Sequence, residues 1–184
     1  MSESTDTNAP LLSGALDGPH RRRGPLHVTF ICTGNICRSP MAEKMFAHQI
    51  QERGLGDAVR VTSAGTGDWH VGSGVDERAR RVLRAHGYPT DHRAARLDDD
   101  HLAADLVIAL GRNHARLLRG LGVDDSRLRM LRSFDPRSGA FVPDVEDPYY
   151  GNHDDFEDVY TVIEAALPGL HDWVDARLAQ NGSG

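Results

Sequence analysis

The stretch from Phe30 to Pro40, FICTGNICRSP, constrains the fold more than any other part of this 184-residue chain. Apolar residues of a predicted strand lead into it, and a helix-like run from Pro40 to Gln51 leads out. The five residues between Cys32 and Arg38 are enough to curl into a bowl whose backbone N–H groups point inward. A loop of this kind before a helix N-terminus is typical of an anion site. The sequence therefore predicts a phosphate-binding loop after the first strand, with a sulfur at its floor.

The residue types of this loop suit a phosphate ligand. Gly34 permits tight curvature, and the planar guanidinium of Arg38 can bind two phosphate oxygens at once. Ser39 is expected to cap the helix, with Pro40 at the first helical position, and its hydroxyl can also donate to a thiolate. A helix N-terminus and a neighbouring arginine stabilise a thiolate over a thiol, so Cys32 is expected to be a nucleophile. The alternative interpretation of Cys32 is a small buried hydrophobic residue at a strand end.

The motif from Cys32 to Pro40 resembles the signature of the low-molecular-weight protein tyrosine phosphatases. The segment Asp147–Gly151 (DPYYG) resembles the general-acid segment of that family and lies near the C-terminus, as the family requires. Further similarity lies in residues 63–65, 68–69 and 76–87, and the resemblance extends over about residues 26–179. It implies hydrolysis of phosphotyrosine through a phosphocysteine intermediate, with Asp147 as general acid and then general base. The residues alone do not distinguish Asp147 from Asp144 in this role.

The resemblance also implies how the cleft is built. Arg38 and the backbone N–H groups from Thr33 to Arg38 hold the phosphate oxygens, and Asn35, Ser63 and His92 brace the loop. Trp69 and the two tyrosines enclose an aromatic ring above an apolar floor at Ile36, although a place in the core is the alternative for Trp69. The expected substrate-binding residues are Thr33, Gly34, Asn35, Ile36, Cys37, Ser39, Trp69, Tyr149 and Tyr150.

Two other functions compete with this interpretation. Related arginine phosphatases carry threonine where this chain has Ile36, which disfavours phosphoarginine as the substrate. A non-catalytic phosphotyrosine-binding module would lack the nucleophile, the arginine or the acid, and all three are present.

One departure from the family is Gly111, where aspartate is common, so a polar support near the site is missing or replaced. Cys37 could form a reversible disulfide with Cys32 under peroxide.

Composition narrows the partners and the compartment. A formal charge of −6 argues against general nucleic-acid binding. The sequence shows no run of about 18 apolar residues and no cleavable signal peptide, so we expect no membrane association. We expect a cytoplasmic monomer, with export without a cleaved signal left open, and no metal or cofactor. The expected partners are phosphotyrosine proteins and, by the resemblance, a tyrosine kinase acting on Tyr149 or Tyr150.

Alternating strand and helix patterns predict an α/β fold: a single doubly wound parallel sheet of about four strands, flanked by helices. Strands are expected at about residues 26–31, 59–63, 104–110 and 128–134, and helices at about 40–51, 76–86, 112–121 and from 156 onward. Residues 25–180 are predicted to form one domain after a disordered extension of residues 1–24. Pro168 lies inside the last helical pattern and predicts a kink or break near Leu167.

Overall fold

The computed structural model describes residues 24–183. The predicted N-terminal extension therefore lies outside the described residues, except for Gly24. Within the described part, no helix is both long and apolar enough to cross a membrane.

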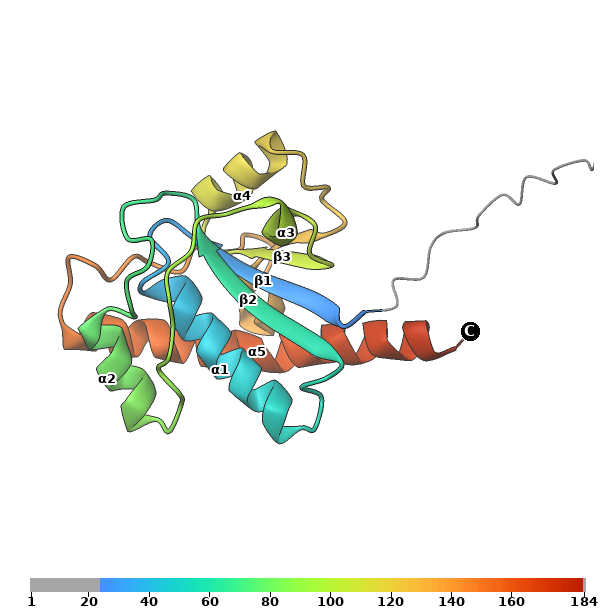
Figure 1. The fold of residues 1–184 in the computed structure, drawn as a ribbon, viewed down its shortest axis with the longest axis horizontal. Coiled ribbons are helices and arrows are strands. Elements are labelled where there is room, and N and C mark those ends of the chain that lie inside the picture. Colours follow the sequence, from blue (N-terminus) through green and yellow to red (C-terminus); the bar gives the residue numbers. More distant parts are fainter. Residues whose placement is uncertain (1–23, 184) are drawn as a thin grey trace, which may run out of the picture.

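Strands and helices alternate along the chain as the sequence predicts (Figure 1). The strands are β1 (Leu26–Cys32), β2 (Val59–Gly65), β3 (Leu106–Ala109) and β4 (Leu128–Met130). The helices are α1 (Arg38–Glu52), α2 (Glu77–Ala85), α3 (Asp99–Leu102), α4 (Arg112–Gly120) and α5 (His153–Gly182), with 3₁₀ turns at Leu131–Phe134 and Pro136–Ser138. All strand pairs are parallel and their order is β2-β1-β3-β4. The predicted α/β fold with a four-stranded parallel sheet is confirmed.

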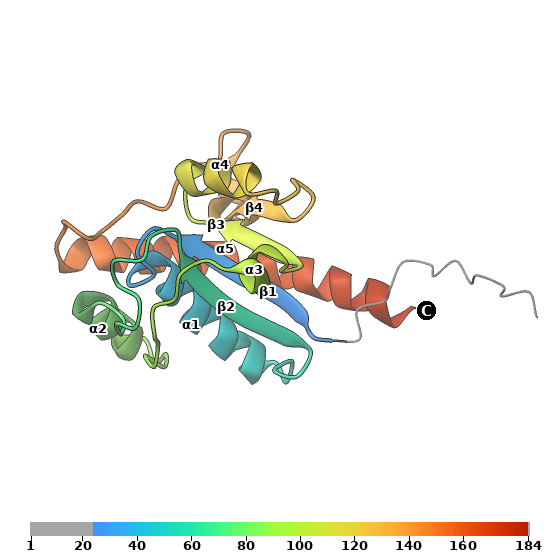
Figure 2. The same cartoon turned by 45° about the horizontal axis from the view of Figure 1, so that its top comes forward.

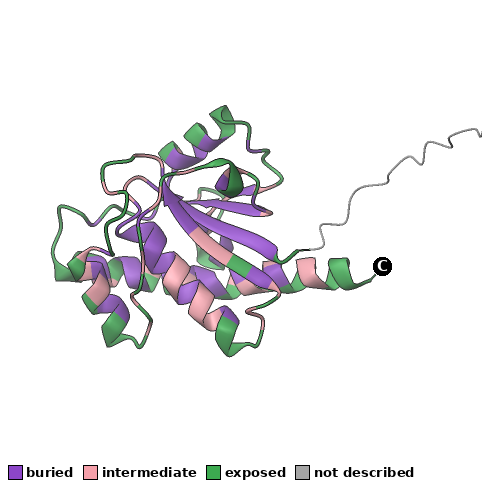
Figure 3. Ribbon diagram, in the orientation of Figure 1, coloured by how far each residue is buried: buried purple, intermediate pink, exposed green. Residues whose placement is uncertain are grey.

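The sheet is covered on both faces. Successive residues of a strand point to opposite sides, so neighbouring residues of β1 belong to different cores. Val28 and Phe30 of β1 belong to the core shared with α1, α2 and α5, whereas Ile31 belongs to the core shared with α4. Figure 2 shows helices on either side of the sheet, and Figure 3 shows that β1 and β3 are buried whereas β2 is partly exposed in its first half. Burial on both faces explains the continuous apolar run of β3.

The topology places the loop after β1 at the edge of the sheet where ligands bind in folds of this type. The neighbours of β1 are β2 on one side and β3 on the other, so the connections leaving these strands diverge beside the end of β1. In open parallel sheets, ligands bind at such a switch point, beyond the carboxyl ends of the strands. The loop between Cys32 and Arg38 lies at this position.

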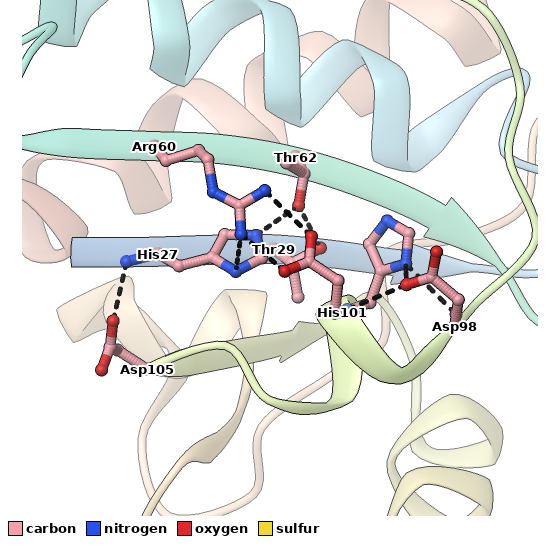
Figure 4. A network of polar contacts seen from close by, with 8 residues as sticks. His27, Thr29, Arg60, Thr62, Asp98, His101 and Asp105 are labelled. Carbon is pink, nitrogen blue, oxygen red and sulfur yellow. Dashed lines mark hydrogen bonds and ion pairs between the residues drawn. The ribbon is translucent and has the colours of Figure 1, made fainter. Parts of the chain in front are cut away.

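A polar network occupies the sheet beneath α3 (Figure 4). His27 is buried, and its Nδ1 accepts a hydrogen bond from Arg60, whose guanidinium is paired with Asp100. Nε2 of His27 donates to the Thr62 hydroxyl, which in turn donates to Thr29. The network therefore fixes a neutral His27 with its proton on Nε2.

Two local predictions are wrong. Helix α5 continues through Pro168 without a break, and neither Figure 1 nor Figure 2 shows a sharp bend. A proline inside a helix costs about 3 kcal/mol, but both flanking turns are packed in the core, with Leu167 and Leu170 almost fully buried. Gly169 lets this part of the helix lie against the Phe134 carbonyl, where a Cβ would be only 2.2 Å from the oxygen.

The fourth strand is shorter than predicted. It ends at Met130, and residues Leu131–Phe134 form a 3₁₀ turn. Residues three apart lie on one side of such a turn, which lets both Leu131 and Phe134 reach the core. An extended strand would have turned these two side chains toward opposite faces.

Candidate active site

The loop after β1 exposes a row of backbone donors. Cys32 is the last residue of β1 and Arg38 is the first residue of α1. Among the described residues, no group accepts a hydrogen bond from the backbone N–H of Gly34, Asn35, Ile36 or Cys37. These residues line one cavity together with Cys32 and Arg38. Free N–H groups at a helix N-terminus are suited to bind an anion.

The strained residue of the loop is Asn35, with φ of 57°. Its side-chain amide donates to the hydroxyls of Ser39 and Ser63, both at 2.8 Å, and its side-chain carbonyl accepts from Ala95 N. His92 Nε2 donates to the backbone carbonyl of Asn35 at 2.8 Å. The four contacts hold a left-handed conformation that is unfavourable for a residue other than glycine. Conformational freedom at Gly34 is not what the turn uses, because its φ is not positive.

The edges of the loop are fixed by neighbouring segments. Thr66 N donates to Cys32 O at 2.9 Å, and Asp76 N donates to Ile36 O at 2.9 Å. The end of β2 approaches so closely that a Cβ on Gly65 would lie 2.6 Å from Thr33 O. Glycine is therefore required at this position for β2 to pack against the loop.

Cys32 has a hydroxyl partner. Its Sγ lies 2.8 Å from Ser39 Oγ, and both residues are buried. The predicted capping role of Ser39 is wrong, because α1 begins at Arg38, two residues before Pro40, and the residue at the cap position, Cys37, makes no side-chain cap. Ser39 instead lies in the first turn of α1, where its hydroxyl faces the sulfur.

Arg38 connects the loop to the segment that carries Asp147. Its side chain is buried, and Nη1 donates to Val145 O at 3.0 Å. Nη2 lies 3.6 Å from the Asp147 carboxylate, about half of which is exposed to solvent. Asp147 also accepts a hydrogen bond from Tyr149 N at 3.2 Å, and it lines the same cavity as Cys32 and Arg38.

The cavity above the loop has a volume of about 370 Å³. Aromatic side chains form its walls: Trp69 is 75% exposed and Tyr150 is 95% exposed, and Tyr149 stands between Tyr150 and His70. The alternative that Trp69 belongs to the core is therefore wrong. All the predicted catalytic and substrate-binding residues line this cavity except Ser39, which lies beneath it together with Ser63 and His92.

Three further residues reach the site without having been predicted. His70 lines the cavity next to Trp69. His114 of α4 is buried and hydrogen-bonded to the Thr33 hydroxyl at 2.9 Å. Arg78 is paired with Asp76, and its guanidinium lies 5.7 Å from the Tyr149 ring. The position of His70 beside Trp69 could have indicated it, but nothing in the sequence connects the other two with the loop.

Burial affects two titrating groups near the loop. It lowers the pKa of His114 to about 4, and the Arg38 guanidinium acts in the same direction, so the imidazole is neutral at pH 7. Burial also raises the pKa of the Cys37 thiol well above its usual range, an effect reinforced by Asp76. Cys37 is therefore protonated at neutral pH.

The departure at Gly111 is compensated by another acid. Asp144, which lies on the segment before Asp147, accepts a hydrogen bond from Arg112 N at 3.0 Å, at the N-terminus of α4. A Cβ on Gly111 would lie 3.4 Å from the carboxylate carbon of Asp144. A polar group is thus present where the family commonly has an aspartate, but it comes from a different part of the chain.

The sequence profile of the low molecular weight phosphotyrosine protein phosphatases matches residues 27–182. The chain belongs to this family. Its sequence is 78% identical to low molecular weight protein-tyrosine phosphatase A of Mycobacterium tuberculosis over 158 residues, which cover 86% of this chain and 97% of that protein. Membership agrees with the cysteine loop, the parallel sheet and the position of the acidic segment.

Solved structures with this fold include a protein tyrosine phosphatase from Entamoeba histolytica and an arginine phosphatase. YfkJ from Bacillus subtilis is 31% identical, with a TM-score of 0.77 and coverage of 85% of this chain and 98% of that protein. The YwlE arginine phosphatase, in a cysteine-to-serine mutant with a phosphorylated active-site serine, is 28% identical, with a TM-score of 0.72 and coverage of 82% and 96%. The fold alone therefore does not decide between phosphotyrosine and phosphoarginine.

Proposed function

We propose that this member of the phosphotyrosine phosphatase family hydrolyses phosphotyrosine in proteins, with Cys32 as nucleophile, Arg38 as phosphate ligand and Asp147 as general acid and base. The observation that carries the proposal is the loop itself. Four free backbone N–H groups, a buried guanidinium and a sulfur meet in one cavity. Preorganised donors of this kind stabilise the charge on the oxygens of a transferring phosphoryl group.

In the first step, the Cys32 thiolate attacks phosphorus while the bond from phosphorus to the tyrosine oxygen breaks. Asp147 donates a proton to the departing oxygen, which leaves as a neutral phenol. The Asp147 carboxylate supports this role, because it is exposed, lies beside Arg38 and lines the same cavity as the aromatic residues. The products of this step are tyrosine and a phosphocysteine.

In the second step, water attacks the phosphocysteine and the bond from sulfur to phosphorus breaks. The Asp147 carboxylate, now without its proton, accepts one from the attacking water. The sulfur departs as a thiolate, and the Ser39 hydroxyl at 2.8 Å supports that charge. Phosphate is released and the enzyme returns to its starting protonation state.

Phosphotyrosine is favoured over phosphoarginine by the surroundings of the loop. Ile36 contributes an apolar side chain to the cavity that holds Cys32, and the aromatic side chains of Trp69 and Tyr149 line the same cavity. Aromatic pairs are stabilising beyond the area that they bury. The 78% identity to a protein-tyrosine phosphatase, against 28% to the arginine phosphatase, supports the same choice.

We also propose phosphotyrosine proteins as partners, with Tyr149 or Tyr150 as acceptors for a tyrosine kinase. Both side chains reach the surface, and Tyr150, 95% exposed, is more accessible than Tyr149, 38% exposed. A reducing cytoplasm is the proposed compartment, in keeping with Cys32 and Cys37 as free thiols.

The test compares hydrolysis of a phosphotyrosine peptide with that of a phosphoarginine peptide of the same sequence. Wild type is expected to prefer phosphotyrosine, Cys32→Ser to be inactive, and Asp147→Ala to bind the peptide but lose most turnover. Glu146→Ala is the matched control, because this exposed neighbour does not line the cavity. Preference for phosphoarginine would overturn the substrate assignment, and binding without hydrolysis by wild type would favour a recognition module.

A further inference from the structure

Arg112, the first residue of α4, holds the segment that leads to Asp147. Its backbone N–H donates to the Asp144 carboxylate at 3.0 Å, and its Nη1 lies 3.4 Å from the same oxygen. Its Nη2 donates to Val142 O, and its guanidinium carbon lies 4.0 Å from the centre of the Phe141 ring. One arginine therefore contacts three residues of a four-residue stretch. We call these contacts the Arg112 clamp.

A side chain at residue 111 would lie beside the clamp. A Cβ at this position would lie 3.0 Å from Asn113 Oδ1 and 3.4 Å, an ordinary van der Waals distance, from the carboxylate carbon of Asp144. An aspartate here would bring a second negative charge against Asp144, and like charges at this separation repel. Absence of a side chain at residue 111 thus lets Asp144 occupy the N-terminus of α4, where a carboxylate is stabilised by the helix dipole.

The clamp is continuous with the active site. Directly after Asp144, Val145 N donates to Leu110 O at 2.8 Å, and Val145 O accepts from Arg38 at 3.0 Å. Arg38 therefore contacts both Val145 and Asp147 in the segment that the clamp fixes at its upstream end. A shift of that segment moves the Asp147 carboxylate relative to the cavity.

We propose that Arg112 and Asp144 are positioning residues for the general acid, and that Gly111 is the feature of this chain that permits the arrangement. The inference rests on the proposed role of Asp147. Both clamp side chains are partly exposed, with 40% and 47% of their side-chain surface accessible. Exposed ion pairs contribute little to stability, so the effect is on the placement of Asp147 and not on folding.

The test uses aryl phosphates that differ in their leaving group. A strongly basic phenolate needs a proton to depart, whereas 2,4-dinitrophenolate departs without one, so loss of the general acid affects phenyl phosphate far more. We compare kcat/KM for phenyl phosphate and 2,4-dinitrophenyl phosphate, since this ratio reports the first phosphoryl transfer. The variants are Arg112→Ala, Asp144→Ala, Asp147→Ala and the double variant Arg112→Ala/Asp147→Ala. Arg119→Ala is the matched control, because Arg119 lies on the same helix in an exposed pair with Asp125.

Arg112→Ala and Asp144→Ala are each expected to lower kcat/KM about tenfold for phenyl phosphate and less than about twofold for 2,4-dinitrophenyl phosphate. In the Asp147→Ala background, Arg112→Ala is expected to cause no further loss. Equal losses on both substrates, or no loss, would overturn the positioning role while leaving the Asp147 assignment intact. If Asp147→Ala itself fails to discriminate between the substrates, the acid assignment falls and the inference falls with it.

Discussion

Ser39 Oγ lies 2.8 Å from Cys32 Sγ, and the same oxygen accepts a hydrogen bond from the Asn35 amide. Since a hydroxyl has one proton and Asn35 supplies another to its oxygen, the proton of Ser39 is directed to the sulfur. The Asn35 contact thus orients the hydroxyl, and the loop conformation and the charge on the nucleophile are linked through one serine.

Ser39→Ala is expected to slow the release of the thiolate from phosphocysteine. A hydrogen bond to a charged group contributes about 1.5–3 kcal/mol, which corresponds to roughly a ten- to hundredfold fall in kcat. Rapid-quench measurement should show phosphocysteine accumulating. Ser63→Ala is the control, because Ser63 accepts from the same Asn35 amide but no contact joins it to the sulfur. Similar accumulation in both variants would mean that the effect comes from Asn35 and not from the sulfur.

Asn35→Ala is expected to lower the free energy of unfolding by about 3 kcal/mol, because it removes three side-chain hydrogen bonds of a buried residue. Asn35→Gly removes the same bonds but relieves the left-handed φ of 57°. It should therefore be more stable than Asn35→Ala by about 1 kcal/mol. Urea unfolding of the two variants measures the difference. Equal stabilities would show that the backbone relaxes when the side chain is lost.

Much of the fold follows from the sequence because each element carries its own local signal. The apolar run of β1, the Asp76 cap of α2 and the positive φ of Gly87 at its end all agree with the predicted boundaries. The phosphate-binding loop was also recognisable, since a cysteine, a glycine, an arginine and a helix start occur within one short stretch.

The features that the sequence did not predict depend on contacts between segments that are far apart in the sequence. Pro168 remains helical because core packing on both sides holds its turns together. The hydrogen bond between His114 and Thr33 spans 81 residues, and Asp144 reaches α4 across 32 residues. No local pattern encodes such distances.

Stability is expected to fall as the pH drops from about 6.5 to 4. Burial, with help from Arg60, lowers the pKa of His27 from 6.5 to about 4, and His114 shows the same lowered value. In this window the unfolded chain binds protons that the folded chain excludes, so acid favours unfolding. Each imidazole contributes up to about 3 kcal/mol to the free energy of unfolding, and this contribution is present in full above pH 6.5 and largely lost by pH 4. Urea unfolding at pH 7, 6 and 5 measures the slope.

His27→Gln isolates one of these contributions. The glutamine amide can donate to Thr62, as Nε2 of His27 does in Figure 4, but it does not titrate. The variant should show a shallower dependence of stability on pH than wild type. The same substitution at His153, exposed near the start of α5, is the surface control. An unchanged slope in His27→Gln would mean that other groups account for the acid sensitivity.

Peroxide inactivation is expected to be reversible by dithiothreitol in wild type and irreversible in Cys37→Ser. Peroxide converts the Cys32 thiolate to a sulfenic acid, and condensation with the Cys37 thiol forms a disulfide and releases water. The attacking species is the Cys37 thiolate, which is scarce at neutral pH because burial raises the pKa of this thiol well above its usual range. Closure of the disulfide should therefore accelerate with pH, and the recoverable fraction of wild type should exceed that of Cys37→Ser at every pH tested. Equal recovery in the two proteins would show that Cys37 gives Cys32 no protection, since the buried thiol would then be too slow to compete with further oxidation.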